Sequence, residues 1–171
     1  GNYLEKGVSP DQGLALARML GHITYLSDES MREKFGRDLK TPKLNFNYEV
    51  EFQIESYLKY QGEKFVTGFD ANTYMLMTKS LDYFDPVKDM SQSLINNLQK
   101  SKSKFLIISF TSDWRFPPKR SKEIVKLLLD NKRNVSYSEI SADGGHDAFL
   151  MGNHDYFDIM RSFIMESNNG I

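Results

Sequence analysis

The sequence predicts an α/β protein in which a helical first part precedes a short parallel sheet with flanking helices. Two observations predict this fold class. The spacing of apolar residues changes near residue 100, from a helical period to short continuous runs that are typical of buried strands. Beyond that point strand and helix patterns alternate, which is the order of elements in parallel α/β architecture.

The composition excludes several classes of protein. The chain has 171 residues, of which 40% are hydrophobic and 26% charged, as in an ordinary globular domain. A net charge of −1 gives no reason to expect nucleic acid or a membrane as a partner. No apolar run approaches the roughly 20 residues of a membrane helix, and the first residues lack the pattern of a signal peptide. Because there is also no cysteine for disulfides, we expect a cytoplasmic protein.

The first helix is predicted from a strong start signal. Ser9 is suited to cap it, Pro10 to occupy its first position, and Gln12 to complete a capping box. Its apolar face is formed by Leu16, Leu20 and Ile23. A break is expected at residues 27–28, and a short amphipathic segment follows over residues 29–35.

Further helices are expected before the sheet. Residues 48–62, "YEVEFQIESYLKYQG", fit both a strand and a helix, and we predict a helix with Gly62 as its C-cap. Asp70 is predicted to cap the next helix, which Pro86 ends. The Ser-, Lys- and Asn-rich residues 88–103 indicate a short helix and a linker.

The second part alternates between strands and helices. Residues 104–110, "KFLIISF", and 135–141, "VSYSEIS", are predicted strands, and residues 117–133 and 152–166 are predicted amphipathic helices. Two strands are too few for such a sheet to be stable alone.

Two residues that are suited to acid–base chemistry follow the two strands. Asp113 comes after the first strand, and His146 lies in "ADGGHDAF" after the second. In open parallel sheets, ligands bind beyond the carboxyl ends of the strands, so both side chains are expected at one edge. A carboxylate that accepts from one imidazole nitrogen leaves the other nitrogen to take a proton. Either residue alone also fits a loop capping role, but their joint position favours a catalytic pair.

The nucleophile that such a pair serves is missing from the sequence. No G-x-S-x-G turn occurs, and no cysteine replaces it. In one large fold class the triad order along the chain is Ser, then Asp, then His. We therefore expect the serine to precede Gly1, and the chain to be the C-terminal half of a longer protein.

Four separated stretches resemble one family. Residues 1–37 and 52–85, together with "TSDWRFPP" and "GGHDAFL", resemble the homoserine O-acetyltransferase family of the α/β-hydrolase superfamily. The resemblance implies the C-terminal part of an α/β-hydrolase fold, with parallel strands and flanking helices, preceded by a helical lid. It places the lid region at residues 1–95 and the part of the core that carries the triad Asp and His at residues 96–171.

The resemblance also implies roles for single residues. Asp113 matches the triad acid, and His146 matches the base. Asp147 matches the carboxylate that holds the amino group of homoserine. Arg18 matches the arginine that takes the substrate carboxylate, and Tyr25 matches a tyrosine of the active-site tunnel. The sequence pattern supports part of these assignments, because positions 18 and 25 share a helix face and an arginine guanidinium can donate two parallel hydrogen bonds to a carboxylate.

The activity implied by the resemblance is acetyl transfer from acetyl-CoA to the hydroxyl of L-homoserine, a reaction of methionine biosynthesis. Acetyl-CoA would be a co-substrate, and neither a bound cofactor nor a metal is expected. A homodimer through the helical lid is also implied. Three alternatives stay open: a relative that uses a succinyl donor or a serine acceptor, an esterase on the same scaffold, and an inactive lid or assembly fragment.

Overall fold

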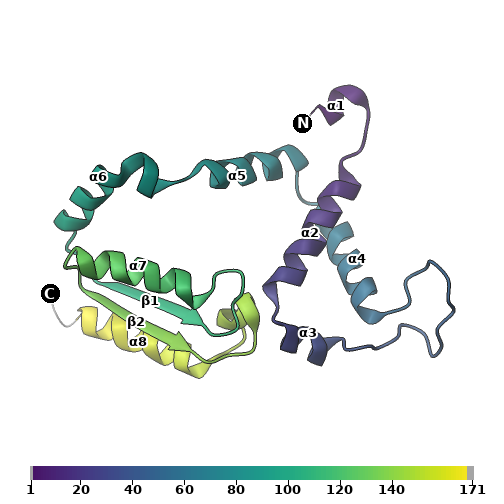
Figure 1. Cartoon of the computed structure of the whole chain (residues 1–171). Coiled ribbons are helices and arrows are strands. Elements are labelled where there is room, and N and C mark those ends of the chain that lie inside the picture. The colour runs from purple at the N-terminus through teal and green to yellow at the C-terminus, as the bar shows by residue number, and fades with distance from the viewer. Residues whose placement is uncertain (1, 169–171) are drawn as a thin grey trace. The chain divides into compact units, whose positions relative to one another are not determined.

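The computed structural model describes residues 2–168, without the side chains of residues 86, 87, 89–91 and 168. The chain forms two compact units (Figure 1). The first comprises Gly1–Thr24 and Met31–Phe84, and the second comprises Tyr25–Ser30 and Asp85–Ile171. The second unit therefore takes six residues, Tyr25–Ser30, from within the helical first part of the sequence. The sequence did not predict that residues 25–30 belong to the second unit. The domain boundary predicted at residues 95–96 stays a prediction.

The first unit is helical. Its helices are α1 (Tyr3–Lys6), α2 (Asp11–Tyr25, whose last residue belongs to the second unit), α4 (Gln53–Val66) and α5 (Ala71–Tyr83). The short helix α3 (Asp28–Lys34) begins in the second unit and ends in the first, so the predicted break after α2 is present.

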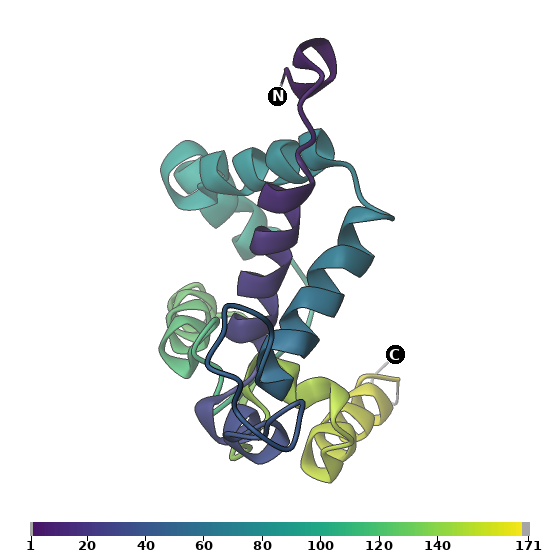
Figure 2. The same ribbon diagram turned by 90° about the vertical axis from the view of Figure 1, so that its right-hand side faces the viewer.

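Helices α2 and α4 lie side by side (Figure 2), and Gly62 lies at their contact. A Cβ on Gly62 would lie 3.0 Å from Met19 Cε and 3.1 Å from both Ala15 Cβ and the Ala15 carbonyl oxygen. The prediction that Gly62 ends the helix is wrong, because α4 continues to Val66 and Thr67 is its C-cap. Close approach of two helices, and not helix termination, accounts for the glycine.

The helix starts follow the predicted capping residues closely. Helix α2 begins at Asp11, one residue later than predicted, and the Asp11 backbone N–H donates to Ser9 Oγ at 3.2 Å. Asp70 caps α5 as predicted, since its carboxylate accepts from Thr73 N at 2.7 Å. Pro86 does more than end a helix: it begins α6 (Pro86–Lys100), which is longer than the predicted short helix.

The apolar face predicted for α2 lies at the surface. Leu16, Leu20 and Ile23 are 64%, 61% and 40% exposed, whereas Leu14 is buried. Helix α5 likewise exposes Leu81. The side of α2 that meets α4 carries Ala15 and Met19, so Leu16 and Leu20 stay largely exposed.

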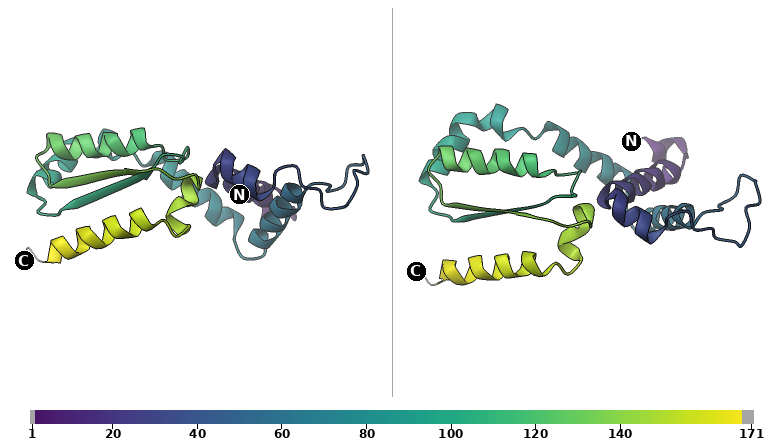
Figure 3. Two further views of the ribbon diagram at one scale, coloured as in Figure 1. Left: turned by 90° about the horizontal axis from the view of Figure 1, so that it is seen from below. Right: turned by 60° about the horizontal axis from the view of Figure 1, so that its bottom comes forward.

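The second unit contains a two-stranded parallel sheet, β1 (Phe105–Phe110) and β2 (Val135–Ile140). The strands pair in register from Phe105↔Val135 to Phe110↔Ile140. Helix α7 (Pro118–Asp130) connects the strands, and α8 (His154–Asn168) follows β2. Figure 3 shows these helices on opposite faces of the sheet. The predicted strand–helix–strand–helix order is confirmed.

The core of this unit lies at the carboxyl end of the sheet. Phe110, Ile140 and Ala148 form it, and Tyr156 and Ile159 of α8 pack against them. Ala148 belongs to a short 3-10 helix, η1 (Gly145–Leu150), which the sequence analysis did not foresee. Among residues 2–168, no helix combines the length and the apolar character that crossing a membrane requires.

Candidate active site

The candidate site lies where the two strands end. Because Phe110 and Ile140 are paired in register, the loops that follow them start side by side. Thr111 links these loops, since its backbone N–H donates to Ile140 O at 3.0 Å and its Oγ1 accepts from Ala142 N at 3.2 Å. A second link runs from Gly145 N to Ser112 Oγ at 2.9 Å. The loops therefore form one hydrogen-bonded unit.

The first loop fixes the carboxylate of Asp113. This residue is 7% exposed, so its charge is largely removed from water. Its Oδ1 accepts from Arg115 N at 3.0 Å and from Phe116 N at 2.8 Å. Two backbone donors satisfy this oxygen, which leaves Oδ2 free to meet a further donor.

That donor is the ring of His146. The distance from His146 Nδ1 to Asp113 Oδ2 is 2.9 Å, so the hydrogen bond predicted between these side chains is present. An ionised carboxylate can only accept, and Nδ1 therefore carries the proton in this contact. Nε2 is then the basic nitrogen of a neutral imidazole. The histidine side chain is 28% exposed and that of Asp113 is 8% exposed, so the base is accessible while its partner is buried.

Three aromatic rings surround the imidazole. The ring centroids of Phe116, Tyr25 and Phe149 lie 5.1, 5.8 and 5.9 Å from that of His146. Contacts on several sides restrict rotation of the imidazole and reduce the access of water to it. The arrangement is suited to proton transfer at Nε2.

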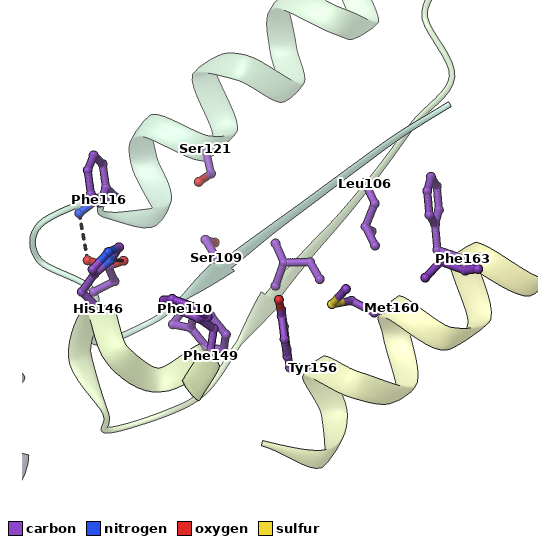
Figure 4. A pocket seen from close by; sticks show the side chains of 13 residues that line it. Leu106, Ser109, Phe110, Phe116, Ser121, His146, Phe149, Tyr156, Met160 and Phe163 are labelled. Carbon is purple, nitrogen blue, oxygen red and sulfur yellow. Dashed lines mark hydrogen bonds and ion pairs between the residues drawn. The ribbon is translucent and has the colours of Figure 1, made fainter. Parts of the chain in front are cut away.

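A pocket of about 550 Å³ lies next to the histidine. Figure 4 shows His146 and Phe116 at one end of it and Phe163 of α8 at the other. Between these ends, β1 contributes Leu106 and Ile108, so the wall is mainly apolar.

The predicted substrate residues are distributed over both units. Tyr25 lies in the second unit beside His146, with the Arg115 guanidinium 4.8 Å from its ring centroid. Asp147 directly follows the histidine in η1 and is half-buried. Arg18 lies in the first unit, where its guanidinium is 5.0 Å from the Phe65 ring. The structure thus brings Asp113, His146 and Tyr25 together, whereas the predicted convergence of Arg18 and of the Asp147 side chain on this site stays a prediction.

Several residues around the site were not foreseen from the sequence. Ser27, Ser30, Ser112 and Trp114 all hydrogen-bond within or onto the two loops. Ser27 lies 116 positions from its partner Asp143, and no short motif links them. Within residues 2–168, no group of three or more His, Cys, Asp or Glu side chains is arranged to hold a metal ion.

Comparison with known sequences gives a consistent result. The chain is 59% identical over 166 residues to the homoserine O-succinyltransferase of Hydrogenovibrio crunogenus, which covers 96% of the chain and 43% of that relative. It is 60% identical over 164 residues to the enzyme of the same name from Nitrosomonas eutropha, covering 96% of the chain and 44% of the relative. This chain is similar to homoserine O-acyltransferases. It spans less than half the length of these relatives, and no protein-family model matches it.

Solved structures define the fold. A homoserine O-acetyltransferase from Bacillus anthracis matches 82% of the chain and 37% of its own length, with a TM-score of 0.68 at 21% identity. Esterase E22 matches 95% of the chain and 45% of its own length, with a TM-score of 0.73 at 19% identity. The fold is that of the C-terminal part of an α/β hydrolase, as the sequence predicted.

Proposed function

We propose that this chain is part of a homoserine O-acyltransferase and supplies the acid and the base of its Ser–His–Asp triad. The observation that carries the proposal is the 2.9 Å hydrogen bond between buried Asp113 and accessible His146 at the carboxyl edge of a parallel sheet. The similarity to enzymes named homoserine O-succinyltransferases supports the same reaction class. Acylation of homoserine places the protein in methionine biosynthesis.

The proposed reaction has two half-steps that share one base. A serine outside these 171 residues attacks the acyl carbonyl of an acyl-CoA, and His146 Nε2 takes its proton. The same proton passes to the departing CoA thiolate, which leaves an acyl-serine. The homoserine hydroxyl then attacks this ester and gives its proton to His146, which returns it to the serine. Throughout, Asp113 stabilises the imidazolium and maintains its orientation.

Two acyl donors, acetyl-CoA and succinyl-CoA, are candidates for the first half-step. The resemblance of the motifs implied acetyl-CoA, whereas relatives at 59% and 60% identity are named succinyltransferases. We propose succinyl-CoA as the donor on the strength of these relatives. Measuring kcat/KM with both acyl-CoAs and homoserine in the full-length enzyme tests this choice. A preference for acetyl-CoA would reverse it.

We propose that the acceptor is recognised by its amino-acid groups. Arg18 would bind the carboxylate of homoserine, and Asp147 would bind its ammonium group. Tyr25 would line the approach to the base. The position of the Tyr25 ring, 5.8 Å from that of His146, supports the role of Tyr25, and the roles of Arg18 and Asp147 rest on the resemblance.

An esterase is the second candidate, because esterase E22 matches 95% of the chain. The pocket and the Asp113–His146 pair would serve an ester substrate equally well. The two functions differ in the acceptor, which is water in one and homoserine in the other. With acyl-enzyme formed on the full-length protein, a large acceleration of turnover by homoserine supports the transferase. Release of free acid at the same rate with or without homoserine would support the esterase.

The nucleophile and the assembly are parts of the proposal that need their own tests. The purified 171-residue chain is expected not to catalyse acyl transfer, since no G-x-S-x-G turn occurs in it. Product well above background from that chain, with mass spectrometry excluding any co-purified polypeptide, would mean that the nucleophile is misplaced.

Exposed apolar side chains on α2 and α5 support a homodimer through the helical region. A monomer by light scattering would contradict it.

A further inference from the structure

We propose that the segment Tyr25–Ser30 positions the general base, and that Ser27 is its central positioning residue. This role rests on the proposed function, because it concerns the base of that reaction. It adds a part of the site that neither the motifs nor the relatives' names assign. The segment lies between α2 and α3 in sequence but belongs to the second unit, where it contacts both loops of the site.

Two serine hydroxyls hold one carbonyl of the histidine loop. Ser27 Oγ donates to the carbonyl oxygen of Asp143, and Ser30 Oγ donates to the same oxygen at 2.9 Å. Ser27 Oγ in turn accepts from Ser30 N at 3.1 Å. Ser27 is only 7% exposed, so water does not readily replace its hydroxyl. The carbonyl three residues before His146 is therefore fixed from outside its own loop.

Gly145 brings the two backbones into direct contact. Its φ is +68°, and a Cβ there would lie 2.7 Å from both the Leu26 carbonyl carbon and the Tyr25 carbonyl oxygen, and closer still to Ser27 N. Real Cβ atoms essentially never come this close to backbone atoms. Only glycine fits, and the residue that precedes the base rests directly on the backbone of residues 25–27.

A third contact reaches the loop of the carboxylate. The indole Nε1 of Trp114, the residue next to Asp113, donates to Leu26 O at 3.2 Å. Residues 25–30 are thus joined to the Asp113 loop through Trp114 and to the His146 loop through Asp143 and Gly145. A segment that holds both loops adds to the direct hydrogen bonds between them, and the distance between the loops decides whether Nδ1 and Oδ2 remain in hydrogen-bond range.

A positioning role predicts effects that simple stabilisation does not. Loss of a merely structural hydrogen bond would lower the melting temperature and leave the properties of His146 unchanged in the folded protein. Loss of a positioning contact would weaken the Asp113–His146 bond in protein that is still folded. Small displacements of catalytic groups can reduce rates severely, so kcat would fall while KM for the acceptor changes little.

The test uses Ser27→Ala, Ser30→Ala and the double variant in the full-length enzyme, with Ser27→Thr as the variant that retains the hydroxyl. Ser138→Ala, a half-buried serine of β2 in the same unit, is the matched control. The first readout is the far-downfield proton resonance of the His146 Nδ1–H, followed with pH in histidine-labelled protein. The second is the separation of kcat from KM.

We expect Ser27→Ala to broaden or shift the His146 resonance and to lower kcat about tenfold, with KM for homoserine within about twofold. Ser30→Ala should have a smaller effect, the double variant the largest, and Ser27→Thr should restore much of the loss. Ser138→Ala should leave the resonance and kcat unchanged.

An unchanged resonance and unchanged kcat in the folded double variant would overturn the positioning role. A fall in kcat that Ser27→Ala and Ser138→Ala share, with the resonance intact, would also overturn it. The resonance reports on the Asp113–His146 bond without any substrate. If the unaltered enzyme shows the resonance but does not acylate homoserine, the proposed function fails, and the response of the resonance to Ser27→Ala still decides the positioning role.

Discussion

The two compact units bring distant parts of the chain together by different means. In the second unit, the segment Tyr25–Ser30 meets the site loops through hydrogen bonds to single backbone carbonyls, those of Asp143 and Leu26. In the first unit, α2 and α4 meet closely at Ala15 and Gly62, and a hydrogen bond of 3.0 Å between Tyr57 Oη and His22 Nδ1 joins the same two helices. Hydrogen bonds constrain distance and angle, whereas apolar contact is non-directional. In the second unit these bonds hold the backbone of the loops that carry Asp113 and His146, and the proposed proton transfer would need that fixed geometry.

Both units also leave large apolar side chains exposed, among them Leu150 and Ile164 in the second unit. The second unit buries Phe110, Ile140 and Ala148 around the site loops. In the first unit, Leu16 and Leu20 of α2 are mostly exposed. A surface of this kind needs a partner, and a binding role for the first unit is compatible with that need.

The largest expected effect tests whether the second unit holds the chemistry. In the full-length enzyme, His146→Ala and Asp113→Asn should each lower kcat by about 10⁴-fold, since each removes a member of the triad. Steady-state acyl transfer to homoserine measures the loss. His154→Ala changes an exposed histidine at the start of α8 and serves as the control, with activity expected to be unchanged. Equal losses of kcat in all three variants would mean that His146 has no specific role in the reaction.

The next effect tests the backbone contact in the second unit. Gly145→Ala should lower the free energy of unfolding by about 3 kcal/mol, from the strain of positive φ together with overpacking. Gly152→Ala is a matched control, because Gly152 has a φ of +69° but nothing within 4 Å of its Cβ position. It should cost about 1 kcal/mol, from the backbone strain alone. Chemical denaturation of both variants measures the difference, and equal losses would mean that the close approach at Gly145 is unimportant.

A third prediction asks what the first unit contributes to the reaction. Arg18→Ala in the full-length enzyme should raise KM for homoserine about tenfold to a hundredfold, because a charge-assisted pair with the acceptor carboxylate is lost. The pre-steady-state burst of acyl-enzyme should stay unchanged, since the thioester does not carry that carboxylate. Arg37→Ala, on the same unit, is the control. A parallel loss in both half-reactions would make Arg18 a structural residue and leave the first unit without a binding role.

The sequence predicted most of the second unit and less of the first. Strand β1 is a short apolar run, and β2 is short and rich in β-branched and aromatic residues, so local pattern alone identifies them. Their parallel pairing then brings Asp113 and His146 to one edge, which is why a contact over 33 positions was predictable. The contact between Ser27 and Asp143 could not be predicted. It depends on where α2 ends in space, and no sequence periodicity indicates that position.

Glycines show the same limit in the first unit. A glycine near the end of a helical pattern predicts a C-cap, and Gly62 was interpreted in that way. Its role depends on Ala15 and Met19 of another helix, and the local sequence pattern around Gly62 carries no information about that neighbouring helix. Local chemistry did predict the Asp70 cap, since an N-cap acts on a backbone N–H only three residues away.

The helix contact of the first unit gives a fourth, smaller effect. Gly62→Ala should destabilise the protein by about 1 kcal/mol, because the overpacking against Ala15 exceeds the gain in helix propensity. Gly13→Ala, also within a helix but with nothing within 4 Å, should stabilise it by about 0.5–1 kcal/mol. Opposite signs in chemical denaturation support the contact between α2 and α4. Two stabilising substitutions would indicate that the helices can separate freely.

The smallest effect compares the two units in acid. Hydrogen bonding and ion pairing with Lys122 at 2.6 Å hold the pKa of Glu139 below its ordinary value, with a further contribution from the Tyr137 hydroxyl. In the first unit, the Tyr3 hydroxyl lowers the pKa of Asp70, and the Thr73 backbone N–H lowers it further.

A lowered folded-state pKa means that the unfolded chain binds protons more readily. Each carboxylate therefore stabilises its unit above the ordinary pKa, and this contribution is lost as the pH falls through the folded value. Glu139→Gln should flatten the acid dependence of amide hydrogen exchange in the second unit below about pH 5, and Asp70→Asn should do so in the first. Both effects are small because the groups are exposed and salt screens them, and added salt should weaken the Glu139 effect. If Glu139→Gln alters exchange in the first unit as much as in the second, the two units unfold together in acid and the contrast between them does not extend to their stability.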